Sequence, residues 1–97
     1  MYVLGLIRYL RPLEEILPHL EAHRAHLRAA QAAGTLLAAG PFDPRDGGAV
    51  LLRVPDAEGL GAAERLRDAD PYTLRGLATY EFRQWNPAIG RDRLDAI

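Results

Sequence analysis

The sequence contains no cysteine, no serine and no lysine among its 97 residues. The missing cysteines exclude disulfides, thiolate nucleophiles and cysteine-ligated zinc or iron–sulfur centres. The missing serines and lysines exclude a serine nucleophile and a lysine Schiff base. Any chemistry must therefore come from other residue types.

Strong charge and long apolar runs are also absent. Twelve arginines are interspersed with thirteen acidic residues, and the formal net charge is −1, so no basic footprint for nucleic acid is present. No apolar run approaches the roughly 20 residues that span a bilayer. Residues 1–9 lack the basic start and cleavage site of a secretory signal. We expect a cytoplasmic single domain over residues 1–97, with no nucleic-acid or membrane partner.

Hydrophobic spacing predicts alternating strands and helices. Four strands are expected, at residues 2–9, 35–39, 49–54 and 77–85. A first helix should run from Leu13 to Gly34 with a kink at Pro18, and a second should follow Asp56 as its N-cap. Asp70-Pro71 predicts a further helix start. Residues 88–97 are too short and charged to add a core element.

This order predicts an α+β fold of the ferredoxin-like β-α-β-β-α-β type. Such a fold has an antiparallel sheet with both helices on one face, and the other face is left uncovered. The strand at residues 2–9 is apolar on both alternating faces. An uncovered apolar face marks an interface, and a two-fold contact uses one patch twice. We therefore expect a homodimer formed through the uncovered face.

Three histidines, His19, His23 and His26, follow one side of the first predicted helix. A metal site is not predicted, because the H-E-x-x-H pattern is missing and further ligands would have to come from elsewhere. His19 and His26 lie away from the apolar stripe and should be solvated. His23 lies at its edge and should be partly buried. It is then either a general acid–base group or a core histidine with satisfied hydrogen bonds.

The aspartates have two readings as well. Asp70 can be a helix cap, a partner that orients a histidine, or both. Asp43 and Asp46 lie in a segment rich in glycine and proline, where turn stabilisation is the common role. The glycines of that segment lack a P-loop lysine and the G-x-G-x-x-G spacing.

Several short segments together resemble the YCII-related (YciI-like) family. They are His23-Arg24-Ala25-His26-Leu27, Ala33-Gly34, Leu36-Leu37-Ala38-Ala39-Gly40-Pro41, Asp46-Gly47-Gly48, and Asp70-Pro71-Tyr72 with Gly76. The histidine seventeen residues before the Gly-Pro pair is His23. The resemblance spans nearly the whole chain, and it implies a ferredoxin-like fold, a dimer and a histidine–aspartate site in a cleft. It assigns the histidine to His23 and the aspartate to Asp70, with Asp46 as a second candidate.

The resemblance also implies a range of reactions, since the family includes a dehydrochlorinase of chlorinated aromatic breakdown and its wider dimeric α/β barrel group includes isomerases. Our hypothesis is an enzyme that abstracts and returns a proton on a small cyclic or aromatic molecule, without metal or organic cofactor. His23 would be the base and Asp70 its orienting partner. Ligand contacts are assigned to Arg8, Pro41, Asp46 and Tyr72, with Arg8 or Tyr72 steadying an oxyanion. The alternative is a non-enzymatic dimer that binds a small ligand or a partner protein.

Overall fold

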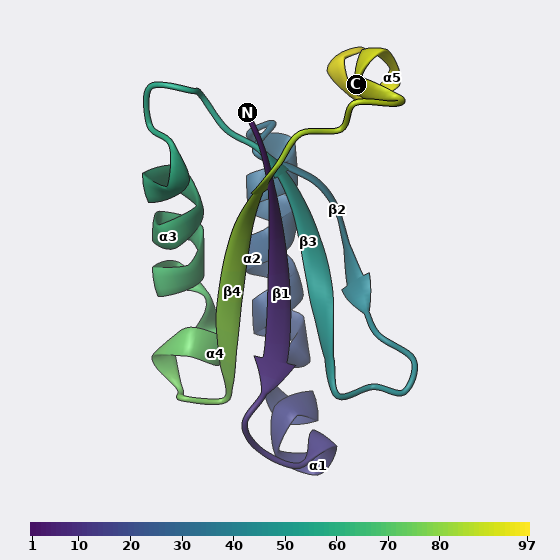
Figure 1. Cartoon of the computed structure of the whole chain (residues 1–97). Coiled ribbons are helices and arrows are strands. Elements are labelled where there is room, and N and C mark those ends of the chain that lie inside the picture. Colours follow the sequence, from purple (N-terminus) through teal and green to yellow (C-terminus); the bar gives the residue numbers. More distant parts are fainter.

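The structure of the chain is a computed structural model that describes residues 1–97. Its strands and helices follow the predicted order (Figure 1). The elements are β1 (Tyr2–Tyr9), α1 (Leu13–Ile16), η1 (Leu17–His19), α2 (Leu20–Ala32), β2 (Leu36–Pro41), β3 (Gly47–Arg53), α3 (Leu60–Ala69), α4 (Pro71–Leu74), β4 (Ala78–Trp85) and α5 (Arg91–Asp95). No helix is both long and apolar enough to cross a bilayer.

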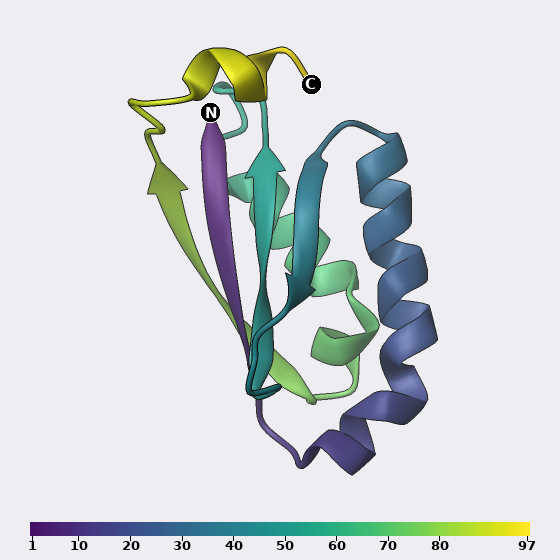
Figure 2. The same cartoon turned by 90° about the vertical axis from the view of Figure 1, so that its right-hand side faces the viewer.

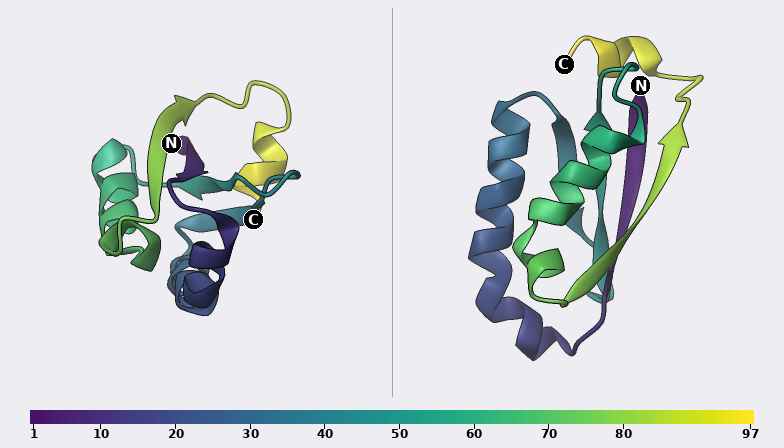
Figure 3. Two further views of the ribbon diagram at one scale, coloured as in Figure 1. Left: turned by 90° about the horizontal axis from the view of Figure 1, so that it is seen from below. Right: turned by 90° about the vertical axis from the view of Figure 1, so that its left-hand side faces the viewer.

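The four strands form one sheet in the order β2-β3-β1-β4, and all neighbours are antiparallel. Helices α2 and α3 lie on the same side of this sheet (Figure 3). This arrangement confirms the predicted ferredoxin-like α+β fold. The core lies between the sheet and these helices, and its members are Val3, Ile7, Ile16, Leu27, Leu36, Val50, Leu52, Val54, Ala63, Leu66, Tyr72, Leu77 and Ala78.

The first helical segment is interrupted at Pro18, as the sequence predicts. Pro18 lies in the single 3₁₀ turn η1, which separates α1 from the regular helix α2. Proline has no N–H to donate to the preceding turn, so the α-helical ladder stops and restarts around it. Gly34 then ends α2 with a φ of 85°, a backbone conformation that side chains other than glycine rarely adopt. The helix is therefore bounded by local sequence signals at both ends.

The predicted N-cap of the second helix is wrong. Helix α3 begins only at Leu60, and its N-cap position is Gly59, which makes no side-chain capping bond and has a φ of 55°. The Asp56 carboxylate instead accepts a hydrogen bond of 2.7 Å from the N-terminal ammonium of Met1. The positive φ of Gly59 keeps the preceding residues out of the helix.

The uncovered face of the sheet is partly closed at one end by α5. This helix crosses the end of the sheet near the N-terminus (Figure 2). The Tyr2 hydroxyl donates to Asp95, and the Arg53 guanidinium donates to the Leu94 and Ile97 carbonyls at 2.8 and 2.6 Å. As predicted, α5 itself adds no buried residue. Tyr2 is nevertheless 2% exposed, whereas Leu6 on the same face is 41% exposed, so the rest of the face remains open.

Candidate active site

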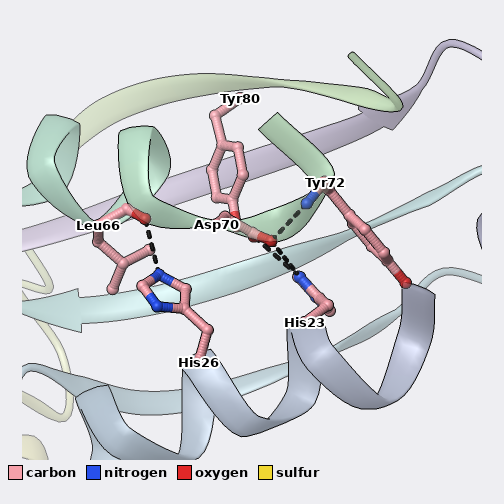
Figure 4. Close-up of polar contacts among 6 residues, drawn as sticks. All are labelled: His23, His26, Leu66, Asp70, Tyr72 and Tyr80. Carbon is pink, nitrogen blue, oxygen red and sulfur yellow. Dashed lines mark hydrogen bonds and ion pairs between the residues drawn. The ribbon is translucent and has the colours of Figure 1, made fainter. Parts of the chain in front are cut away.

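His23 lies on the face of α2 that packs against the sheet, and it is 8% exposed. Its Nδ1 atom lies 2.9 and 2.8 Å from the two carboxylate oxygens of Asp70 (Figure 4). A carboxylate only accepts hydrogen bonds, so Nδ1 carries the proton and donates it. The structure thus brings together two residues that are 47 positions apart in the sequence.

Asp70 is fully buried and connects three donors. Besides the imidazole of His23, the carboxylate accepts hydrogen bonds from the Tyr80 hydroxyl and, at 2.9 Å, from the Tyr72 N–H. The last bond makes Asp70 the N-cap of α4, with Pro71 at the first helical position, as predicted. Burial raises the pKa of the Asp70 carboxyl, but the hydrogen bonds outweigh that effect and the pKa lies below its ordinary value. Asp70 is therefore an anion at neutral pH.

The ring of Tyr72 stacks on the ring of His23. The two centroids are 3.9 Å apart and the planes differ by 4°. Tyr9 in turn meets Tyr72 edge-on, with centroids 6.0 Å apart. Because Asp70 holds the Nδ1 edge of the imidazole and Tyr72 its flat face, the ring of His23 has a fixed orientation.

The second ring nitrogen of His23 is the free one. Nε2 makes no hydrogen bond within the protein, and it is not among the polar atoms that are closed off from solvent. His23 lines a cavity of about 380 Å³ between α2 and strands β2 and β3. Other residues around this cavity include Tyr9, Leu20, Arg24, Leu27, Arg28, Gln31, Pro41, Arg45, Val50 and Tyr72. The volume is enough for one small ring compound.

The two tyrosines that contact this pair are neutral donors at neutral pH. Burial raises the pKa of Tyr72 to about 12, and the Asp70 charge contributes to the rise. Burial also raises the pKa of Tyr80, with the nearby charge of Asp70 as the second cause. Both hydroxyls therefore keep their protons. The Tyr80 hydroxyl donates its proton to Asp70 in a hydrogen bond, whereas the Tyr72 hydroxyl has no hydrogen-bond partner.

Of the ligand-contact residues predicted from the sequence, Pro41 and Tyr72 line the cavity with His23, and Arg8 and Asp46 do not. The last two lie at a second hollow, with Leu6, Phe42, Thr79 and Glu81. Strand alternation explains the position of Arg8, because Ile7 and Tyr9 point to the helix side and Arg8 points to the open face. Asp46 lies at the loop before β3 and does not contact His23, so it is not the histidine's partner.

The expectation that His26 is solvated is also wrong. Its side chain is partly buried, and Nε2 lies 2.8 Å from the Leu66 carbonyl oxygen, to which it donates (Figure 4). His26 thus joins α2 to α3. No three histidine or acidic side chains converge in a way that could hold a metal ion.

Sequence reasoning missed several residues of the site. Arg24, Arg28 and Arg45 line the cavity, and Tyr80 completes the donors around Asp70. Alternation along β4 could have found Tyr80, because it shares a face with the apolar Phe82 and Ala78. Arg45 comes from the loop between β2 and β3, where no periodic pattern applies.

Comparisons with known proteins agree with this fold. Residues 1–86 match the family model described as the YCII-related domain. A solved structure of 5-chloro-2-hydroxyhydroquinone dehydrochlorinase from Burkholderia phenoliruptrix, in complex with 2,5-dihydroxybenzoquinone, superposes with a TM-score of 0.72. It is 22% identical, and the match covers 89% of this chain and 94% of that one. No curated protein matches the chain.

Proposed function

The chain belongs to the YCII-related domain family, and we propose that it is an enzyme that moves a proton on a small cyclic or aromatic compound. In this proposal His23 is the general base and acid, and Asp70 is a positioning residue that holds it. In this proposal neither role requires a metal ion or an organic cofactor. The family and the fold are compatible with other functions, so the proposal depends on the site.

The proposal depends on one observation: of the two ring nitrogens of His23, one is hydrogen-bonded within the protein and the other is not. Nδ1 donates to the buried Asp70, and Nε2 keeps an unpaired lone pair on a ring that lines the cavity. A histidine that merely filled the core would have both nitrogens satisfied inside the protein, as buried polar groups normally are. An imidazole held in one tautomer by a carboxylate is instead the usual arrangement of a general base.

We propose elimination of HCl, or isomerisation, as the reaction. Nε2 takes a proton from a hydroxyl or ring carbon of the substrate. In the elimination the electron pair left behind forms a new double bond, and chloride leaves with its bonding pair. In the isomerisation the same proton returns to another substrate atom. Neither reaction needs an oxidant or a reductant. The dehydrochlorinase activity named for the similar structure supports the first.

Chloride release from 5-chloro-2-hydroxyhydroquinone tests this proposal, with 2,5-dihydroxybenzoquinone as a binding probe. We expect release by the wild type and its loss in His23→Gln, while binding of the probe survives in both. If related chlorinated and unchlorinated ring compounds show neither chloride release nor solvent deuterium uptake, the chain is no enzyme of this class. Binding without turnover would support the alternative, a ligand-binding module.

We further propose that the chain is a homodimer through the open sheet face. Leu4 and Leu51 pair directly across that face, and Leu6 beside them is 41% exposed. Light scattering should give about twice 10.7 kDa. Leu6→Glu should shift the mass to the monomer, because it places a charge in an apolar contact. The control Leu74→Glu changes a more exposed leucine, on α4, and should leave the dimer intact. A monomeric wild type at micromolar concentration would overturn this proposal.

A further inference from the structure

The cavity beside His23 has an unbalanced charge. Three of the twelve arginines line it, and no aspartate or glutamate does. Arg28 and Arg45 form no ion pair, and Arg24 has only an exposed glutamate at 3.6 Å. The one carboxylate nearby, Asp70, lies behind the imidazole and is held by three donors. In a chain of net charge −1, this wall is a local excess of positive charge.

Two donors at this cavity have no acceptor. The Tyr72 hydroxyl is closed off from solvent and makes no hydrogen bond, in a residue that is 1% exposed. The Nε of Arg45 is also closed off and unpartnered. Buried polar groups are nearly always hydrogen-bonded, so such pairs of donors call for an explanation. An oxygen atom of a ligand would supply the acceptor that both lack.

The two donors belong to residues that line the same cavity. The positive charge of Arg45 acts on the Tyr72 hydroxyl, although burial is the larger influence and raises the Tyr72 pKa to about 12. The hydroxyl therefore remains a donor. Arg45 lies on the loop between β2 and β3, and its guanidinium carries a permanent positive charge.

We propose that the cavity binds its substrate by an oxygen anion, a carboxylate or a phenolate, held between the Arg45 guanidinium and the Tyr72 hydroxyl. Arg24 and Arg28 add to the positive field. The substrate class of the proposed enzyme is thus a small ring acid, and the anion anchors the ring beside Nε2 of His23. This inference rests on the proposed function only in calling the ligand a substrate, because anion binding can be measured without turnover.

Matched pairs of small probes test the charge requirement. Benzoate and benzamide have nearly the same shape, and only benzoate is an anion. The 4-nitrophenol and 4-nitrophenolate pair tests the phenolate in the same way. We expect calorimetry or NMR titration to show that the anion binds roughly tenfold or more tightly than its neutral partner. The tighter of the two anions identifies the group. Equal affinities within each pair, or no anion binding at millimolar concentration, would overturn the proposal.

Variants locate the anion. Arg45→Gln should weaken benzoate binding roughly 10- to 100-fold and leave benzamide nearly unchanged, while Arg45→Lys should retain part of the affinity. Arg93→Gln removes the same charge from the exposed helix α5 and should change neither. Tyr72→Phe should weaken benzoate binding without lowering the Tm, because it removes an unpartnered hydroxyl. Unchanged benzoate affinity in Arg45→Gln would overturn the assignment.

The outcome is separable from that of the proposed reaction. Benzoate affinity is measured without turnover, so the result does not depend on whether His23 transfers a proton. If benzoate binding depends on Arg45 but no proton transfer is found, the anion site stands and the reaction falls. If proton transfer is found but anions bind no more tightly than neutral probes, the reaction stands and the anion site falls.

Discussion

The cavity beside His23 and the hollow beside Arg8 lie on opposite faces of one sheet, and both are lined by charged residues. At the hollow, Arg8 is accompanied by Asp46 and Glu81, and all three side chains are exposed. Water satisfies such groups, and charges of both signs offset one another. The hollow therefore has charged residues but no group that lacks a partner.

The cavity differs from the hollow in the burial of its polar groups and in the balance of its charges. Asp70, behind the His23 ring, is completely buried; the arginines of the cavity have no acid on the same wall, and two of its donors have no acceptor. Groups that are buried at a cost in free energy persist where they serve binding or catalysis. The type of residue therefore does not identify a site in this molecule. What identifies it is whether the charges and donors are satisfied.

The largest effect is expected for His23→Gln. It removes Nε2, the nitrogen that is proposed to take the substrate proton, and turnover of a true substrate should fall by ~10²–10⁴-fold. His26→Gln is the matched control on the same helix, because His26 donates to the Leu66 carbonyl and does not line the cavity. Steady-state kinetics should show turnover within a few-fold of the wild type for the control. Equal losses in both variants would mean that the effect is structural.

Asp70→Asn should cause the second largest loss of turnover. Asparagine caps a helix about as well as aspartate, so the bond from the Tyr72 N–H can persist. Its amide can also donate to Nδ1, which would place the imidazole proton on Nε2 and leave no base at the cavity. We expect turnover to fall on the order of 10²-fold or more, and ¹⁵N NMR to show the changed tautomer. Asp46→Asn, at the hollow, should have neither effect. An active Asp70→Asn variant would remove Asp70 from the mechanism.

The acid stability of the fold should depend on Asp70. Because the folded-state pKa of Asp70 lies below its ordinary value, the carboxylate stabilises the fold above about pH 4 and loses this contribution as the pH falls through the folded-state pKa. Denaturant unfolding should show the wild type more stable than Asp70→Asn by about 1–3 kcal/mol near neutral pH, with a smaller difference in acid. A difference that stays constant or grows in acid would contradict the assignment.

The smallest effect is expected at the hollow. Arg8→Gln changes an exposed side chain that has no buried partner, so the free energy of unfolding should change by less than about 0.5 kcal/mol. Turnover should stay within about twofold of the wild type, because Arg8 points away from the cavity. A loss of turnover as large as that of Asp70→Asn would move the site to the open face of the sheet.

Local signals in the sequence predicted much of the fold and the partial burial of His23. Apolar spacing predicted the β-α-β-β-α-β order, Pro18 the break before α2, and Asp70-Pro71 the start of α4. His23 follows from the helical phase that places it between Leu20 and Leu27. Each of these features depends on residues within a few positions of one another, which is the range over which spacing is informative.

The rest depends on contacts between distant residues. The N-terminal ammonium engages Asp56 from 55 positions away, and no local pattern could indicate that. The face on which Arg8 lies could not be predicted, because both alternating faces of β1 are apolar and the pattern does not say which one the helices cover. Arg45 reaches the cavity from a loop, where side-chain direction has no period.

The position of the ring proton on His23 in the wild-type protein tests the central claim most directly. The claim requires a proton on Nδ1, donated to Asp70, and an unprotonated Nε2 at the cavity. ¹⁵N NMR of the ring distinguishes the two tautomers without any substrate. The account predicts the Nδ1–H form for neutral His23, with the Nε2 signal shifting when a ligand enters the cavity. A proton on Nε2, or an Nε2 signal insensitive to every ligand that binds, would contradict it.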